Sequence, residues 1–282
     1  MSAITAALGE RTARPSARPR PAATLAVAVV VLAVALAWAV LPWLFTAQDP
    51  IAGVAADALQ APSAAHPFGT DATGRDLLAR VIFGAGNSLS GAAIAVLVGL
   101  VVGTAIGVLA GSLGGLLEEA LMRIVDVLLA IPGLLLALSV IVLLGFGVAN
   151  AAIAVGVTSI AVFARLARSQ VVRVRRSDYV EAAFGSGGTF LGVLGRHVLP
   201  NSLGAVLALA ALQFGSAILQ ISTLGFLGYG APPPIPEWGL LIAESRDYVA
   251  TAWWLTTLPG VVVAGVVLSA NRVAAAIRER SA

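Results

Sequence analysis

Residues 178–201 read DYVEAAFGSGGTFLGVLGRHVLPN, a polar segment between two strongly apolar ones. Asp178 and Glu181 are three residues apart, the capping-box spacing, and predict a short helix with Asp178 as its N-cap. The glycines that follow, among them Gly187, are expected to bend or end that helix. A second amphipathic piece then leads to Pro200, which suits the first turn of a new helix. The segment is too short for a domain and reads as a connector.

The composition of the chain is that of a polytopic membrane protein. Of its 282 residues 59% are hydrophobic and 11% are charged, with a mean hydropathy of +0.96, above what soluble domains reach. All 17 basic residues are arginine. Their placement accounts for the high pI without a nucleic-acid partner. The absence of cysteine excludes disulfides and thiolate metal sites.

Apolar runs of about 20 residues predict an all-α membrane protein with a single transmembrane domain over 22–282. A preceding tail, 1–21, combines arginine with proline and is expected to be disordered and basic. The first run is too long for a signal-peptide core, so we expect an uncleaved helix. The six predicted spans are 22–45, 86–113, 117–145, 149–166, 203–224 and 252–270.

The distribution of arginine predicts the orientation. With six spans and both termini on one side, 14 arginines lie on that side and three on the other. A buried arginine costs about 2.5 to 3.5 kcal/mol on the insertion scale, and arginine-rich segments stay inside the cell. Both termini and residues 178–201 are therefore expected in the cytoplasm.

Two features of the spans predict contacts. Arg123 and Asp126 are three residues apart and are expected to pair on one helix face. Glycine recurs every four residues in the second span, so a neighbouring helix, in this chain or in a partner subunit, can approach closely. These glycines are Gly99, Gly103, Gly107 and Gly111.

Several motifs resemble one family. Glu181-Ala182-Ala183, Gly187 and the run His197-Val198-Leu199-Pro200-Asn201 resemble the EAA loop of ABC importer membrane subunits. They are most similar to the permeases of the dipeptide, oligopeptide and nickel group, as the C-type subunit of the permease pair. HPFGTD at 66–71, with GRD after it, and MRIVD at 122–126 also match this group. The resemblance covers about residues 60–280. For His66 and Asp71 themselves, turn and cap roles are favoured over ligand roles.

The resemblance implies a six-helix ABC importer permease whose loop 178–201 forms a coupling helix docked in a groove of a cytoplasmic ATPase. Glu181 would cap the helix or pair with a basic ATPase residue, and Gly187 would provide a bend. Tyr179, Val180, Ala182 and Ala183 would make the apolar contact. Asp178, His197 and Pro200 complete the predicted docking set, with a structural role favoured for His197. An amphipathic connector lying on the bilayer is the alternative reading.

The sequence also departs from the family pattern. Phe184 and Ser186 stand where the loop usually has basic and apolar residues, and the glycines at 185 and 188 are expected to add flexibility. The last inner segment lacks the family's Gly-Asp pair. These departures affect how closely the contact with the ATPase follows the family pattern.

Catalysis is assigned to other chains. The sequence has no Gly-x-x-x-x-Gly-Lys-Ser/Thr phosphate loop and no lysine at all, so ATP and Mg²⁺ are expected at partner ATPase subunits. No cofactor or metal is expected on this chain. The resemblance implies a homologous second permease, one or two ATPases, an extracytoplasmic binding protein, membrane lipid, and a location in a bacterial inner membrane.

The substrate class follows only from the resemblance. It implies import of di- or oligopeptides, with nickel or a metal chelate as the alternative and an ATP-independent secondary transporter or channel ranked lower. Gln213, Ser216 and Gln220 recur at helical spacing in the fifth span. This polar stripe lines a translocation path or holds helices together, and the sequence does not decide between the two.

Overall fold

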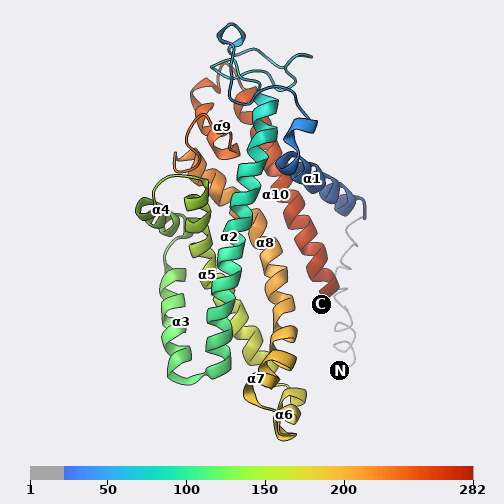
Figure 1. The fold of residues 1–282 in the computed structure, drawn as a ribbon, viewed down its shortest axis with the longest axis vertical. Helices are drawn as coiled ribbons and strands as arrows, with labels where there is room; N and C mark the ends of the chain where they lie inside the picture. The colour runs from blue at the N-terminus through green and yellow to red at the C-terminus, as the bar shows by residue number, and fades with distance from the viewer. Residues whose placement is uncertain (1–21, 282) are drawn as a thin grey trace, which may run out of the picture.

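The computed structural model describes residues 22–281, an elongated bundle of helices (Figure 1). At one end lie the short helices α6 (Asp178–Gly185) and α7 (Phe190–Val193), and we call this the α6 end. At the opposite end, the α9 end, lie α9 (Trp238–Glu244) and the long connection between α1 and α2. The predicted tail 1–21 falls outside the described residues.

Within residues 22–281 five helices are long and apolar enough to cross a membrane, and a bent pair makes six if it is counted as one broken span. Hydropathy located the apolar centres of these helices but not their ends, because most helices continue into polar sequence. The second, for example, begins at Leu77 and not at residue 86, where Asp76 caps it by accepting from Ala79 N at 2.7 Å. The five are α1 (Ala22–Val40), α2 (Leu77–Leu113), α5 (Val148–Arg175), α8 (Leu199–Phe226) and α10 (Trp254–Ser281).

The predicted span over 117–145 is broken inside the segment. The segment forms α3 (Gly115–Ala130) and α4 (Gly133–Leu144), which meet at 99°. Pro132 is the cause, because it lacks an amide hydrogen and disfavours helical backbone in the residue before it. Ile131 accordingly has the extended angles φ −84° and ψ 129°.

The glycine face of α2 packs against α5, so the close neighbour is within this chain. A Cβ at Gly103 would lie 2.4 Å from the carbonyl oxygen of Ile160, and one at Gly107 would lie equally close to that of Ala164. A side chain at either position would force the two helices apart. The packing prediction is confirmed, and among the described helices α2 and α5 share the most extensive contact.

A second set of contacts ties α3 to α5, and it differs from the predicted pair of Arg123 with Asp126. Asp126 forms its ion pair with Arg165 of α5. Arg123 instead reaches Glu119 at 3.5 Å on its own helix. The prediction is wrong because α3 lies beside α5, so Asp126 meets a cation across the helix contact.

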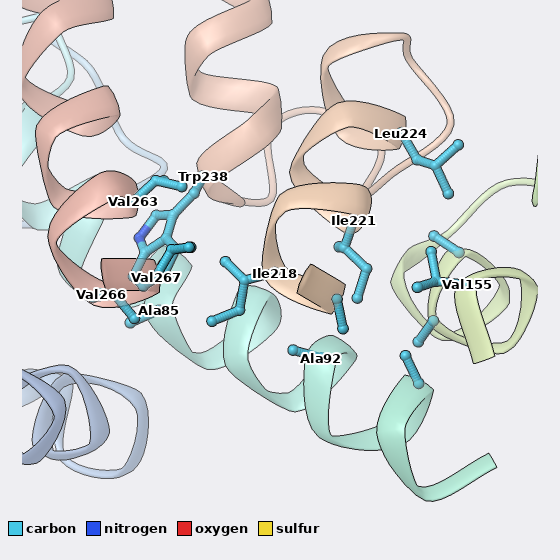
Figure 2. Close-up of a cluster of buried hydrophobic side chains, with 14 of the residues drawn as sticks. Ala85, Ala92, Val155, Ile218, Ile221, Leu224, Trp238, Val263, Val266 and Val267 are labelled. Carbon is cyan, nitrogen blue, oxygen red and sulfur yellow. The ribbon is translucent and has the colours of Figure 1, made fainter. Parts of the chain in front are cut away.

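The main core lies towards the α9 end, where alanine and β-branched side chains from α2, α5, α8 and α10 meet (Figure 2). Trp238 from α9 is fully buried in this cluster and donates from Nε1 to the Val81 carbonyl at 2.9 Å. The connection between α8 and α10 therefore does not lie wholly outside the bundle. Its helix α9 inserts a side chain between α2 and α10.

Candidate functional site

The start of α6 differs from the predicted capping box. Ser177, not Asp178, occupies the N-cap position, with extended angles of φ −83° and ψ 145°. Its hydroxyl donates back to the Val174 carbonyl at 2.6 Å, so it does not cap the helix through its side chain. Asp178 and Glu181 both lie in the first turn, where their negative charge favours the helix dipole. That is one residue further into the helix than the capping box requires.

Gly187 ends α6 as predicted. Its φ of +87° is left-handed backbone that favours glycine, and its amide donates to the Phe184 carbonyl at 3.0 Å. The amide of Gly188 donates to the Ala183 carbonyl at 3.0 Å, which completes a Schellman motif. A Cβ at Gly188 would lie 2.6 Å from the same Ala183 oxygen, so this turn requires glycine there. The turn after α6 is closely packed.

Two of the predicted docking residues face inward. Val180 has no exposed surface, and Ala183 is partly buried beside it. A side chain without exposed surface cannot touch a partner, so Val180 fails as a predicted contact residue and instead anchors α6 to the bundle. The small cluster that holds it consists of Val171, Val174, Val180, Val193 and Val198.

The other face of α6 is open. Tyr179 is 48% exposed, and the side chains of Asp178, Glu181, Ala182 and Phe184 are exposed as well. The helix therefore presents an aromatic and acidic surface outward, on an element that a valine holds in place.

The chain after the turn runs into α8 without a break. Thr189 caps α7 by accepting from Gly192 N at 3.3 Å, and a π-helical turn over Leu194–Val198 follows. Pro200 lies in the first turn of α8, as predicted. Because proline has no amide hydrogen to bond the carbonyl four residues earlier, the wider turn suits this position. His197 is partly buried, and its carbonyl accepts from Asn201 at 2.6 Å.

A hollow of about 420 Å³ opens between the end of α6 and the start of the next helix. Small residues form most of its wall, and Arg196 and His197 also line it. Arg196 is exposed and was not among the predicted docking residues. Its basic character beside His197 in the loop was the signal that could have singled it out. The remaining lining residues are Ala183, Ser186, Gly187, Gly188, Thr189, Gly192 and Val193.

The predicted polar stripe on α8 is only partly enclosed. Ser216 is exposed, while Gln213 and Gln220 are half-buried. The Gln220 side-chain oxygen lies 3.4 Å from the Thr158 hydroxyl of α5. The stripe thus joins two helices at Gln220 and leaves Ser216 free to face a path or a partner.

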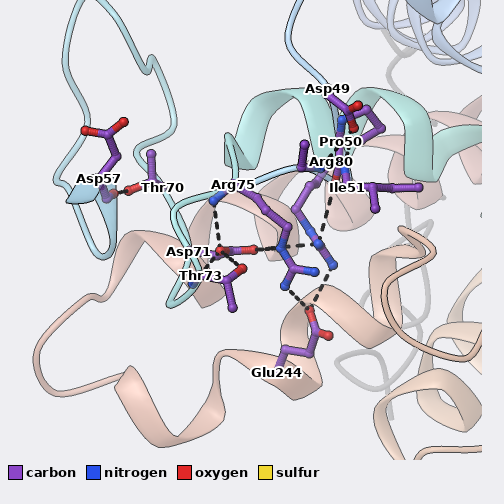
Figure 3. A network of polar contacts seen from close by, with 11 residues as sticks. Asp49, Pro50, Ile51, Asp57, Thr70, Asp71, Thr73, Arg75, Arg80 and Glu244 are labelled. Atoms are coloured by element: carbon purple, nitrogen blue, oxygen red, sulfur yellow. Dashed lines mark hydrogen bonds and ion pairs between the residues drawn. The ribbon is translucent and has the colours of Figure 1, made fainter. Parts of the chain in front are cut away.

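The α9 end holds a buried ion network that sequence reasoning missed (Figure 3). Arg80, with no exposed surface, donates from Nη2 to Glu244 Oε2 at 2.9 Å, and its Nη1 lies 3.6 Å from Asp71 Oδ2. Arg75 Nε donates to the same Asp71 oxygen at 2.6 Å. The network joins the start of α2 to α9, 164 residues later. The available signal was Arg80 itself, an arginine among apolar residues shortly before the predicted second span.

The turn role expected for Asp71 is confirmed, whereas the His66 side chain contacts Asp76, the residue that caps α2. His66 Nδ1 lies 2.9 Å from Asp76 Oδ2, and Asp71 Oδ1 accepts from Thr73 N at 2.8 Å and Arg75 N at 3.1 Å. Burial raises the pKa of Asp71. The two backbone hydrogen bonds, a further hydrogen bond from the Thr73 hydroxyl and the positive charge of Arg75 outweigh this effect, so the pKa is lowered overall.

Glu237 is the buried acid of α9. Its carboxylate accepts from Gly239 N and Leu240 N, each at 2.9 Å, and from the Ser88 hydroxyl at 3.2 Å. Burial raises its pKa, against the opposing effect of these donors. The carboxylate acts as the N-cap of α9 and links that helix to α2.

Comparison with known proteins decides the family. Residues 103–281 match the family described as "Binding-protein-dependent transport system inner membrane component". The chain belongs to this family. It is 37% identical over 221 residues to the dipeptide transport system permease protein DppC of Alkalihalophilus pseudofirmus, which covers 78% of this chain and 73% of that protein. It is 39% identical to the di/tripeptide permease DppC of Pseudomonas aeruginosa, with the same coverage.

Other relatives and solved structures agree. A probable D,D-dipeptide permease, DdpC of Escherichia coli, is 39% identical over 79% of this chain and 74% of its own length. The MetNI methionine ABC transporter in an inward-facing form has a TM-score of 0.56 at 18% identity, covering 71% of this chain and 97% of that one. An amino acid ABC transporter gives 0.57 at 15% identity, covering 71% and 94%. The chain is thus a multi-span inner-membrane permease subunit of a bacterial ABC importer and has that fold.

Proposed function

We propose that this permease carries short peptides, forming half of a translocation pathway that is opened by ATP hydrolysis on separate subunits. A binding protein would deliver the peptide on the outer side, and a homologous second permease would form the other half of the pathway. Support for the substrate class comes from relatives named for dipeptide, di/tripeptide, D,D-dipeptide and glutathione transport. Each of those substrates is a short peptide.

The observation that carries the coupling role is the two-sided character of α6. Its exposed face bears Tyr179 and Glu181, while Val180 fixes its other face to α5 and to the start of α8 through the valine cluster. A partner that pulls on this helix therefore moves α5 with it. The exposed face also bears Phe184, and the two carboxylates in the first turn favour a protein partner over the surface of a bilayer.

The arginine distribution supports a cytoplasmic α6 end. Six arginines lie on α5 after residue 164 and in the loop to α8, and they are Arg165, Arg168, Arg173, Arg175, Arg176 and Arg196. With that end inside, both chain termini lie inside as well, and α9 faces the binding protein. Cytoplasmic ATPases would then reach α6 directly, and ATP and Mg²⁺ would bind there and not on this chain.

The experiment is affinity purification of the tagged chain from native membranes, with mass spectrometry of the proteins that accompany it. Wild type is compared with Glu181→Arg and with the control Glu119→Arg, an exposed glutamate on α3. We expect P-loop ATPases and a second permease with the wild type and the control, and loss of the ATPases with Glu181→Arg. Uptake of a radiolabelled dipeptide should fall in parallel. A wild-type chain that purifies alone would refute the proposal.

A further inference from the structure

The hollow beside α6 is shaped by features of this chain's own loop. Gly188 allows the turn to close against Ala183, and the last turn of α6 then forms one wall while the start of the following helix forms the other. Gly187 and Gly192 add no side chains to the interior. The result is a cavity of about 420 Å³, large enough for several side chains of a partner.

Acidic and basic residues lie in different parts of this loop. Asp178 and Glu181 lie in the first turn of α6, whereas the hollow lies at its last turn and is lined by Arg196 and His197. No carboxylate is among the residues that line it in the described chain. Neither Arg196 nor His197 has an ion-pair partner among residues 22–281. A solvent-exposed arginine in the wall of a hollow lined mostly by small residues fits an incoming anion.

We propose that this hollow receives an acidic segment of the ATPase, one whose Asp or Glu side chain pairs with Arg196. The inference rests on the proposed function and deepens it, because it gives the loop a second contact besides the exposed face of α6. The acidic first turn would meet basic residues of the partner, and the basic hollow would meet acidic ones. Acidic residues at the start of α6 and a basic residue in the turn after α7 fix the orientation of the docked partner, since the reversed arrangement would place like charges together.

The first test exchanges the charge. Arg196→Glu should lower the amount of ATPase that co-purifies by at least about tenfold, because a like charge now faces the acidic segment. Arg196→Lys should retain most of it. The control Arg123→Glu makes the same change at an exposed α3 residue outside the hollow and should match the wild type. Monodisperse elution of each variant in detergent checks that it folds.

The outcomes separate the two proposals. Absence of ATPase with the wild type refutes the proposed function. ATPase that accompanies the wild type and Arg196→Glu equally well overturns the present inference and leaves the proposed function standing. Loss of the ATPase with Arg196→Lys as well as with Arg196→Glu would also overturn the present inference, since the partner would then not be recognising the positive charge.

The second test identifies what enters the hollow. The chain has no cysteine, so Ser186→Cys places one unique attachment point for a short photo-crosslinker on the wall of the hollow. We expect an adduct with an ATPase peptide that contains Asp or Glu within a few residues of the crosslink. The matched control Arg173→Cys, exposed on α5, should not give that adduct. An adduct with lipid alone, or with an ATPase peptide without acidic residues, overturns the inference.

Discussion

Substitution of Gly103 by alanine is expected to destabilise the protein by forcing α2 and α5 apart. The added Cβ would lie 2.4 Å from the Ile160 carbonyl oxygen and 2.7 Å from the Phe163 Cβ, and both atoms belong to α5. The helices must separate by roughly 0.6 Å before the closest contact reaches even 3.0 Å, and overpacking of this kind typically costs about 1 to 3 kcal/mol. The close contacts at the neighbouring glycines of α2 would loosen as the helices separate. We therefore expect a loss of unfolding free energy in the upper part of that range.

The assay is thermal unfolding of the purified protein in a mild detergent, followed by intrinsic tryptophan fluorescence. The matched control is Gly204→Ala on α8, where an added Cβ meets no atom within 4 Å. Alanine is the better helix former by about 0.5 to 1 kcal/mol, so the control should unfold at or above the wild-type temperature. A Gly103→Ala protein as stable as Gly204→Ala would refute the close α2–α5 packing.

Three further predictions concern the two ends of the bundle. Glu244→Ala removes the closest partner of the fully buried Arg80 and should cost about 3 kcal/mol, measured as the same unfolding shift; an unchanged midpoint would contradict the network. Because the pKa of Asp71 is lowered, its contribution to stability is present above about pH 3.9 and is lost as pH falls through the lowered folded-state value. Unfolding midpoints taken from pH 5 to pH 3 should therefore fall less steeply for Asp71→Asn than for wild type, and equal slopes would argue against the shift. Gly187→Val should cost about 1 to 2 kcal/mol through its left-handed backbone and weaken ATPase retention, whereas Gly185→Val, a helical position with open space, should do neither.

Local features of the sequence predicted local features of the structure. The glycines after Phe184, among them Gly187, predicted that α6 bends or ends there because few residues tolerate left-handed backbone, and the spacing of glycines on α2 gave the face along which a helix approaches. Pro200 likewise lies in the first turn of a helix. Each of these depends on the backbone within one or two turns, which a single sequence encodes directly.

Features that depend on the arrangement of several helices were missed or wrongly assigned. Val180 belongs to an apolar helical face that a partner or the bundle itself could cover, and the sequence does not distinguish the two. Asp126 was predicted to pair with Arg123 on its own helix. Its actual partner, Arg165, lies beside it only because α3 packs on α5. The pairing of Arg80 with Glu244 across 164 residues is of the same kind. Pro132 indicated a break in the helix, but the angle between α3 and α4 depends on where α4 can pack.

The arrangement around α6 favours transmission of force over local flexing. Val180 joins this helix to Val171 and Val174 of α5, and α5 in turn meets α2 along glycines that leave no room for relative sliding. The Arg168 guanidinium adds a link to Glu118 of α3 at 2.6 Å. A displacement of α6 by a docked partner is therefore passed to α2, α3 and α5 as a group. Interfaces as close-packed as this respond by moving together and not by deforming, so motion at the α6 end should reach the polar stripe of α8 beside α5.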